Sequence, residues 1–312
     1  MSPLRVVAGV IERADGRVLI AQRPPGKAYA GYWEFPGGKI EPGESAHAAI
    51  VRELAEELAL EVRTAYPWLR RRFTYPHATV ELRFFRIAEW SGALRGCEGQ
   101  QISWESVDDP QVAPMLPANG PVLAGLRLPL EYALTQAMAM GIDAQLQALE
   151  RALRRGLRLV QVREPGMDDA TLERFARAVV SRAHASGARV LINGDLARAQ
   201  RVGADGVHLR SAQLRTLSSR PEAALIGASC HDQQELAAAY RLGCDFAALG
   251  PVQTTATHPG AIPLGWERFA SLACECEFPV YALGGLNFSD LDRARAAGAH
   301  GTALQRAAWR VS

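Results

Sequence analysis

The chain has 312 residues, 48% of them hydrophobic, and a formal net charge of +2. This length suggests two domains with packed cores, and the near-neutral charge gives no electrostatic reason to expect a nucleic-acid polymer or a membrane surface as partner. There is no signal-peptide pattern and no run approaching the roughly 18 apolar residues of a membrane helix. Five cysteines without a CxxC pair indicate reduced thiols, so we expect a cytoplasmic protein.

The first part of the chain alternates apolar runs with turn signals, which is typical of strands. Two apolar runs around the Ala14-Asp15-Gly16 turn predict a hairpin, and apolar residues at helical spacing predict a closing helix. The expected strands lie at 5–11, 18–22, 33–35, from 62 onward, 77–90 and 102–107, and the closing helix at 119–128. Together with one further helix, this pattern predicts an α/β sandwich.

That further helix follows a glycine turn at Gly37-Gly38, and Ser45 can cap it with its hydroxyl. One face is apolar, with Ile50, Val51, Leu54 and Leu58. Another face gathers Glu53, Glu56 and Glu57, whose carboxylates repel one another unless a cation lies between them. A hard divalent ion such as Mg²⁺ is the natural counter-charge. The alternative is a solvated acidic face on which Arg52 is an ordinary ion-pair partner.

The whole pattern is Gly38-x5-Glu44-x7-Arg52-Glu53-Leu-x-Glu56-Glu57-x-Ala59-Leu60. It resembles the signature box of Nudix hydrolases, which split diphosphates linked to another moiety. The resemblance implies an α/β/α sandwich with a mixed sheet, and an Mg²⁺ cofactor that Mn²⁺ could replace. One position departs: the family's helix-closing glycine is Ala59 here.

Outside the box, the stretch from Trp33 to Glu41, WEFPGGKIE, resembles the MutT branch, which hydrolyses oxidised purine nucleoside triphosphates. This resemblance implies substrate-binding roles for Arg23, Phe35, Gly38, Lys39 and Asn119. Asn119 stands in a Pro-Ala-Asn turn and could instead cap the closing helix, while Phe35 could be a core aromatic and Arg23 a strand-end charge. The loop that carries an Asp-Arg pair in the best-known members reads His77-Ala78 here.

The resemblance also implies a set of metal ligands, namely Gly37 (through its carbonyl), Glu53, Glu56, Glu57 and Glu98. Bound Mg²⁺ would neutralise phosphate oxygens and activate a water. Glu53 is the expected general base, with Glu98 as second choice, although Glu98 could be any loop carboxylate. Arg52 is expected to orient the glutamates and Glu44 to support the box.

From residue 129 onward the pattern changes to short apolar runs that alternate with helical segments. The expected strands are 131–135, 157–163, 189–193, 206–209, 225–229, 246–250, 280–284 and 300–304, with helices such as 144–155, 169–186, 233–242 and 289–297. Eight such units predict a (β/α)₈ barrel whose site residues lie at the carboxyl ends of the strands. We therefore expect two domains, 1–128 and 129–312.

The second half resembles thiamine phosphate synthase and its relative TenI, through the runs YALTQ at 132–136, QVRE at 161–164, GVHL at 206–209, GPV at 250–252 and GGL at 284–286. The ligand residues that this implies are Gln161, Arg163, Asn193, Ser229, His231, Gly284 and Gly285. The amides of the glycine pair suit a phosphate, but these glycines could equally serve a strand-to-helix turn.

Departures from the synthase pattern carry more information. The lysine expected after Arg163 is absent, a metal-binding Asn-Asp step reads Asn193-Gly194, and a second metal-binding aspartate is Gln213. A later loop at 254–258, TTATH, also lacks its lysine, and no lysine follows Lys39 anywhere in the chain. Pyrophosphate departure would lack its main electrostatic stabilisation, so we do not expect thiamine phosphate synthesis. His231 matches a TenI-like catalytic histidine or simply begins a helix.

Three hypotheses follow from the sequence. The leading one is hydrolysis of 8-oxo-dGTP to 8-oxo-dGMP and pyrophosphate in nucleotide-pool sanitation (DNA repair, mutation avoidance), with a catalytically degraded barrel. A second takes a thiamine-pathway diphosphate as substrate, and a third makes the barrel a binding or dimerising module for a thiamine-related phosphate. The oligomeric state stays open.

Overall fold

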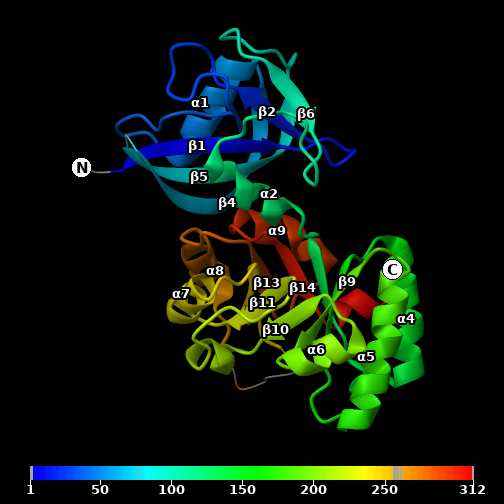
Figure 1. Cartoon of the computed structure of the whole chain (residues 1–312). Coiled ribbons are helices and arrows are strands. Elements are labelled where there is room, and N and C mark those ends of the chain that lie inside the picture. Colours follow the sequence, from blue (N-terminus) through cyan, green and yellow to red (C-terminus); the bar gives the residue numbers. More distant parts are fainter. Residues whose placement is uncertain (1–2, 77, 256–259, 261, 311–312) are drawn as a thin grey trace. The chain divides into compact units, whose positions relative to one another are not determined.

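The computed structural model describes residues 3–76, 78–255, 260 and 262–310 and divides the chain into two compact units (Figure 1). The first unit is Met1–Arg127 with the short segment Cys274–Glu277, and the second is Leu128–Ala273 with Phe278–Ser312. The domain limits 1–128 and 129–312 stay a prediction about which segments fold independently.

The first unit contains two small sheets. In one the strand order is β1 (Leu4–Ile11), β5 (Ala78–Ser91), β4 (Glu61–Tyr75); β1 runs parallel to β5 and β4 antiparallel to it, so this sheet is mixed. In the other, β2 (Val18–Gln22) lies between β3 (Trp33–Glu34) and β6 (Ile102–Glu105), and both pairings are antiparallel.

Successive residues of β1 point to opposite faces, and a helix covers each face. Val7 and Ile11 belong to the hydrophobic cluster that includes helix α1 (Ala46–Leu58). Ala8 and Val10 belong to the cluster that includes helix α2 (Gly120–Leu126). Helix α2 follows a 3-10 turn at Pro117–Asn119. The expected α/β/α sandwich with a mixed sheet is therefore present.

The expected hairpin between the first two strands is wrong. β1 pairs with β5 along its whole length. Only the connection between β1 and β2 is bridged, by an isolated bridge from Glu12 to Val18 and a hydrogen bond from the Arg13 amide to the Arg17 carbonyl, among the described residues. The reason is that both edges of β1 are taken. On the edge away from β5, the amides of Val7 and Gly9 donate to the carbonyls of Gly38 and Pro36.

The second unit is a closed barrel of eight parallel strands, in the order β10-β11-β12-β13-β14-β7-β8-β9. They are β7 (Glu131–Leu134), β8 (Leu159–Val162), β9 (Arg189–Asn193), β10 (Gly206–Leu209), β11 (Leu225–Cys230), β12 (Phe246–Leu249), β13 (Val280–Leu283) and β14 (Gly301–Leu304). Every strand expected from the sequence is present, so the (β/α)₈ barrel is confirmed.

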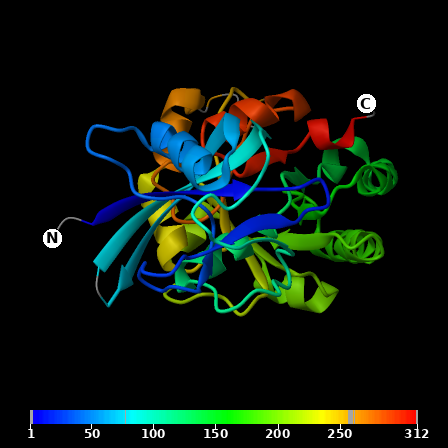
Figure 2. The same cartoon turned by 90° about the horizontal axis from the view of Figure 1, so that it is seen from above.

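The helices of this unit are α3 (Ala137–Met140), α4 (Ile142–Arg155), α5 (Asp169–His184), α6 (Leu196–Val202), α7 (Gln233–Arg241), α8 (Gly265–Ala273) and α9 (Leu291–Ala296). Figure 2 shows α4 and α5 side by side on the outside of the barrel. Inside, the rings of Tyr132, Phe246 and Tyr281 pack at centroid distances of 5.2 to 5.6 Å. The barrel interior is therefore filled by side chains, as such barrels usually are. Within the described part of the chain, no helix is long and apolar enough to cross a membrane.

Candidate functional site

Two glycines allow the turn before α1 to lie against its neighbours. Gly37 has φ +145°, and a Cβ there would lie 2.2 Å from the carbonyl oxygen of Val7. A Cβ on Gly38 would lie 2.3 Å from the Glu53 carboxylate. Any larger residue would push the turn off β1 or the carboxylate off the turn. The glycines therefore fix where Glu53 lies.

Helix α1 is held at both ends. The Ser45 hydroxyl accepts a hydrogen bond from the amide of Ala48 at 3.1 Å, which confirms the expected cap. At the other end Ala59 adopts φ +55° and ψ +34°, the left-handed conformation that glycine favours at this position. Ile50, Leu54 and Leu58 are fully buried, so the glutamates lie on the side turned away from the core.

Arg52 links these glutamates to the loop before the helix. Its guanidinium donates to both oxygens of Glu44 at 3.0 Å, to Glu53 at 2.9 Å and to Glu56 at 3.1 Å. It also donates to the Lys39 carbonyl at 3.0 Å. A planar fork with several donors suits this task better than a lysine would. The orienting role of Arg52 and the supporting role of Glu44 stay predictions.

Glu57 and Glu98 come together around a lysine. The Lys27 ammonium lies 2.6 Å from Glu98 Oε2 and 3.7 Å from Glu57 Oε1. Glu57 also accepts a hydrogen bond from the Gly37 amide at 3.2 Å, and burial raises the pKa of this carboxyl to about 7. The Gln100 amide donates to the Glu57 carbonyl at 2.9 Å and so ties the loop of Glu98 to the end of α1. Lys27 was not singled out as a site residue, because a lysine in a loop carries no spacing signal.

The donor set suits a hard divalent cation, although the carboxylates here face side-chain cations. Among the described residues, no group of three or more His, Cys, Asp or Glu is spaced to hold a metal ion, because Glu53 turns to Arg52 while Glu57 and Glu98 turn to Lys27. The Lys27 ammonium stands in for a cation between two carboxylates, which is where Mg²⁺ would find oxygen ligands. The ligand set, including the Gly37 carbonyl, stays a prediction.

The expected substrate residues on this side differ in exposure. Arg23 forms an ion pair with Glu34 and donates to the Ala28 carbonyl at 2.6 Å. Phe35 is only 2% exposed and packs edge-on against Phe84 with ring centroids 6.0 Å apart. Its side chain therefore belongs to the core, and only the small exposed part of its ring could contribute to a base pocket.

The amide of Asn119 donates to the Trp33 carbonyl at 3.2 Å, and this side chain is 4% exposed. No side-chain hydrogen bond caps helix α2. The capping alternative for Asn119 is therefore wrong, and its amide ties the Pro-Ala-Asn turn to strand β3. Lys39 is exposed beside the glycine turn. His77, the position of the departing base loop, lies outside the described residues.

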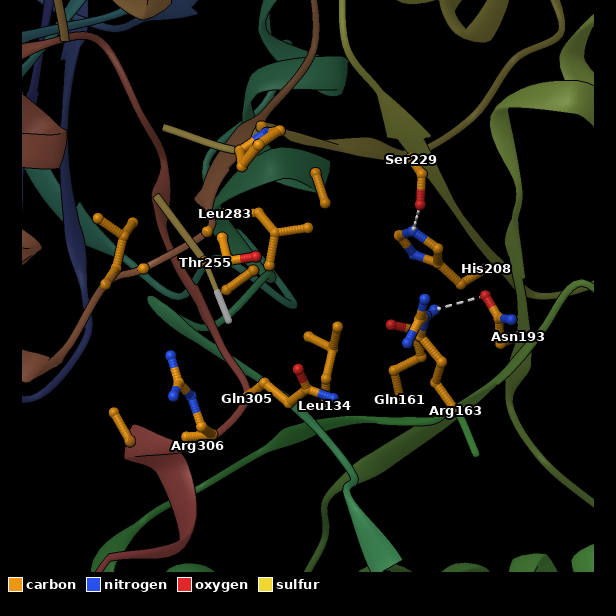
Figure 3. Close-up of a pocket in the computed structure, with 18 of the residues that line it drawn as sticks. Leu134, Gln161, Arg163, Asn193, His208, Ser229, Thr255, Leu283, Gln305 and Arg306 are labelled. Carbon is orange, nitrogen blue, oxygen red and sulfur yellow. Dashed lines mark hydrogen bonds between the residues drawn. The ribbon is translucent and has the colours of Figure 1, made fainter. Parts of the chain in front are cut away.

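The second unit has a cavity of about 520 Å³ at the carboxyl ends of its strands (Figure 3). All eight strands contribute, because its walls include residues from the ends of β7 through β14. The seven ligand residues expected from the sequence all line this cavity: Gln161, Arg163, Asn193, Ser229, His231, Gly284 and Gly285. Segments up to about 120 residues apart in the chain thus meet in one place, as they do in barrels of this kind.

A buried chain of hydrogen bonds opens into the cavity and was missed from the sequence. Tyr132 Oη lies 2.9 Å from His208 Nδ1, and His208 Nε2 lies 3.0 Å from Ser229 Oγ. Burial, with a smaller contribution from the Arg163 charge, lowers the pKa of His208 to about 3. The imidazole is therefore neutral at physiological pH. His208 stands in the GVHL run, which carries the resemblance to thiamine phosphate synthase but by itself indicates no hydrogen-bond partner for the histidine.

The positions where the synthase pattern would have metal-binding aspartates are Gly194 and Gln213 in this chain. Asn193 accepts a hydrogen bond from the Gln161 amide at 3.2 Å (Figure 3). Gly194 has φ +68°, and a Cβ there would lie 2.5 Å from Nε of Arg210. The Gln213 side chain donates to the Gly194 carbonyl at 3.1 Å and accepts from the Arg210 amide at 3.0 Å. A guanidinium therefore lies beside the position of the missing carboxylate.

The remaining cavity residues serve structure as well as lining. At the start of α7, His231 Nδ1 lies 2.8 Å from Glu235 Oε2. The same oxygen accepts a hydrogen bond from the His231 backbone amide. Gly284 and Gly285 have φ +107° and +73°, and Cβ atoms there would clash with the loop that follows β12. These glycines therefore serve the turn that also borders the cavity. Residues 256–258 of the departing TTATH loop lie outside the described part.

Comparison with known proteins agrees with both halves. A family model described as NUDIX domain matches residues 7–125, and one described as thiamine monophosphate synthase matches residues 131–308, more than half of the chain. The CTP pyrophosphohydrolase of Escherichia coli is 38% identical over 123 residues, which are 39% of this chain and 90% of that relative.

Two further relatives show the same division. The 8-oxo-dGTP diphosphatase of Escherichia coli is 33% identical over 127 residues, 41% of this chain and 98% of that relative. The thiamine-phosphate synthase of Thioalkalivibrio sulfidiphilus is 35% identical over 179 residues, 56% of this chain and 85% of that relative. The chain therefore belongs to the thiamine monophosphate synthase and TenI family through its barrel and to the Nudix hydrolases through its N-terminal domain.

Proposed function

We propose that the Nudix domain hydrolyses a nucleoside triphosphate to the monophosphate and pyrophosphate with Mg²⁺, which Mn²⁺ could replace. The observation that carries this proposal is the arrangement around Arg52, which holds Glu44, Glu53 and Glu56 in one hydrogen-bonded set. Two further carboxylates, Glu57 and Glu98, form ion pairs with the Lys27 ammonium. Repulsion between carboxylates at this spacing costs helix stability unless a cation lies among them.

Bound Mg²⁺ would lower the pKa of a water and neutralise phosphate oxygens, held by Glu53, Glu56, Glu57, Glu98 and the Gly37 carbonyl. The chain's own residues do the rest. Glu53, set in place by Arg52 at 2.9 Å and by the close approach of Gly38, would accept the proton of the attacking water on a carboxylate oxygen. Glu98 is the second choice for this base, because it is exposed and its loop is tied to α1.

We propose that the preferred substrate is 8-oxo-dGTP, which carries an oxidised purine base, and that the enzyme acts in nucleotide-pool sanitation. Support comes from the relatives named 8-oxo-dGTP diphosphatase and from Asn119, whose carbonyl oxygen can accept from a base while its amide is held by Trp33. Arg23 and the exposed Lys39 would hold the substrate, with Gly38 allowing close approach. A relative that is 38% identical over 123 residues is named CTP pyrophosphohydrolase, so CTP is the competitor to test.

The barrel supports a second candidate. Its family membership and its cavity favour binding of a thiamine-related phosphate, but the cavity lacks lysine and carboxylate side chains among its described lining residues. We infer that the barrel does not catalyse thiamine phosphate synthesis. A thiamine-pathway diphosphate then becomes the alternative substrate of the Nudix site.

The test is kcat/KM with Mg²⁺, measured as pyrophosphate release from 8-oxo-dGTP, dGTP and CTP and as orthophosphate release from thiamine diphosphate, whose single anhydride bond yields thiamine monophosphate and orthophosphate. We expect the highest value with 8-oxo-dGTP and a loss of at least a hundredfold in Glu53→Gln. The matched control is Glu61→Gln, which removes an exposed carboxylate at the start of β4. Unchanged rates in Glu53→Gln would refute the role of Glu53, and preference for thiamine diphosphate would assign the alternative.

A further inference from the structure

The barrel cavity carries positive charge that nothing in the described protein neutralises. Its lining includes Arg163, Arg210, Arg306 and Arg310, and it includes no aspartate or glutamate. None of these four guanidiniums forms an ion pair with another described residue. The sequence of residues 256–261, Ala-Thr-His-Pro-Gly-Ala, adds no carboxylate.

Arg210 is the most informative of the four. Its guanidinium lies against Gly194, where a Cβ would be only 2.5 Å from Nε and 3.0 Å from Cζ. Gln213 holds both ends of this contact, through the Gly194 carbonyl and the Arg210 amide. A side chain at position 194 would require the Arg210 guanidinium to move from this place. Where the synthase pattern has a carboxylate, this chain has a guanidinium, and Gly194, Arg210 and Gln213 together hold it there.

The divalent cation that the synthase family implies does not fit this cavity. Mg²⁺ requires oxygen ligands and prefers carboxylates, whereas Asn193 is held by Gln161 and the next residue is Gly194. A guanidinium beside them would repel a cation. The same charge attracts a phosphate, to which arginine can donate two hydrogen bonds at once.

We propose that this cavity binds a small phosphorylated ligand without a divalent cation, with Arg163 and Arg210 supplying the charge that a metal would otherwise supply. This deepens the proposed ligand-binding role of the barrel and rests on it. Arg163 and Arg306 lie on opposite sides of the cavity view in Figure 3, so a ligand between them meets positive charge at both sides. A volume of about 520 Å³ suits a small organic molecule.

The experiment is calorimetric titration of the full-length protein in EDTA with two probes, inorganic pyrophosphate and thiamine phosphate. We compare the wild type with Arg210→Gln and Arg163→Gln. Arg154→Gln is the matched control, since Arg154 lies in the last turn of α4 and does not line the cavity. Melting temperatures establish that each variant is folded, and Arg210 and Arg163 are at least partly exposed.

We expect at least one probe to bind in EDTA with one site per chain. Each cavity variant should weaken that binding at least tenfold, because a hydrogen bond to a charged group is worth about 1.5–3 kcal/mol, and Arg154→Gln should leave it unchanged. The proposal is overturned if neither probe binds in EDTA, or if all three variants bind alike.

Failure of this proposal is separable from failure of the Nudix proposal. Arg210→Gln should leave Mg²⁺-dependent pyrophosphate release unaltered, because Arg210 lies in the other unit. Binding in EDTA without any nucleotide hydrolysis would remove the Nudix proposal and leave this one standing.

Discussion

Lys27 is one of two lysines in the chain, and its ammonium lies between Glu57 and Glu98. Unit charges about 4 Å apart near a protein surface interact by about 4 kcal/mol before solvation costs. This side chain therefore offsets the repulsion within the carboxylate group when no other cation is bound. A metal ion that enters must displace it.

We predict that Lys27→Met raises the affinity of the protein for Mn²⁺ by about tenfold, because the metal no longer competes with a tethered cation. Titration of Mn²⁺ followed by electron paramagnetic resonance measures this affinity directly. Lys39→Met is the control for a general loss of positive charge near the box. Equal gains in both variants, or weaker binding in Lys27→Met, would show that Lys27 does not occupy the place of the metal.

His208 carries a second prediction at this scale. Its pKa is about 3 in the folded protein, mainly because of burial, against an ordinary value of 6.5. Between these values the unfolded chain binds a proton that the folded chain does not, so the free energy of unfolding falls as the pH drops below 6.5. Each pH unit costs about 1.4 kcal/mol, which amounts to ~2 kcal/mol at pH 5.

The measurement compares urea unfolding at pH 7 and pH 5, followed by circular dichroism, for the wild type and His208→Gln. The variant should lose about 2 kcal/mol less between the two pH values, whatever its stability at pH 7. His47→Gln, a change at an exposed histidine of α1, should keep the wild-type pH dependence. The same slope in all three proteins would contradict the assignment.

At the scale of elements, the end of helix α1 is the feature that departs from its family. The residue after the helix has φ +55°, and in this chain it is Ala59. Its amide donates to the Ala55 carbonyl at 3.1 Å and the Leu60 amide to the Leu54 carbonyl at 3.2 Å, a hydrogen-bonded helix end. The turn therefore forms without glycine, at the cost of a left-handed residue that has a Cβ.

We predict that Ala59→Gly raises the free energy of unfolding of the N-terminal unit by about 1 kcal/mol, since glycine adopts this conformation without the steric penalty. Urea unfolding followed by tryptophan fluorescence measures this, because the N-terminal unit holds four of the six tryptophans, Trp33, Trp68, Trp90 and Trp104. Ala55→Gly, at an exposed position inside the same helix, should instead lower stability by about 1 kcal/mol. A loss of stability in Ala59→Gly would contradict the conformation at residue 59.

Elements also show where sequence patterns mislead. The two apolar runs around residues 14–16 read as a hairpin because hairpin signals are local. β1 instead lies between β5 and the glycine turn, and a partner more than sixty residues away leaves no local signal.

At the scale of the whole molecule, the two units differ in how they collect their functional groups. In the Nudix unit the carboxylates come mainly from one helix, so their spacing in the sequence already places three of them on one face. In the barrel the lining comes from all eight strands. There only the closure of the sheet brings residues such as Gln161 and Arg306 to one cavity.

The sequence by itself determined the two families, the barrel, the acidic face of α1 and seven of the residues that line the barrel cavity, because these depend on short-range periodicity and on motifs. Tertiary structure alone decided that Lys27 lies among the glutamates, that Asn119 bonds to Trp33 and does not cap a helix, and that Arg210 lies against Gly194. Each of these contacts joins residues from separate loops or strands. Their positions follow from packing, which no local pattern encodes.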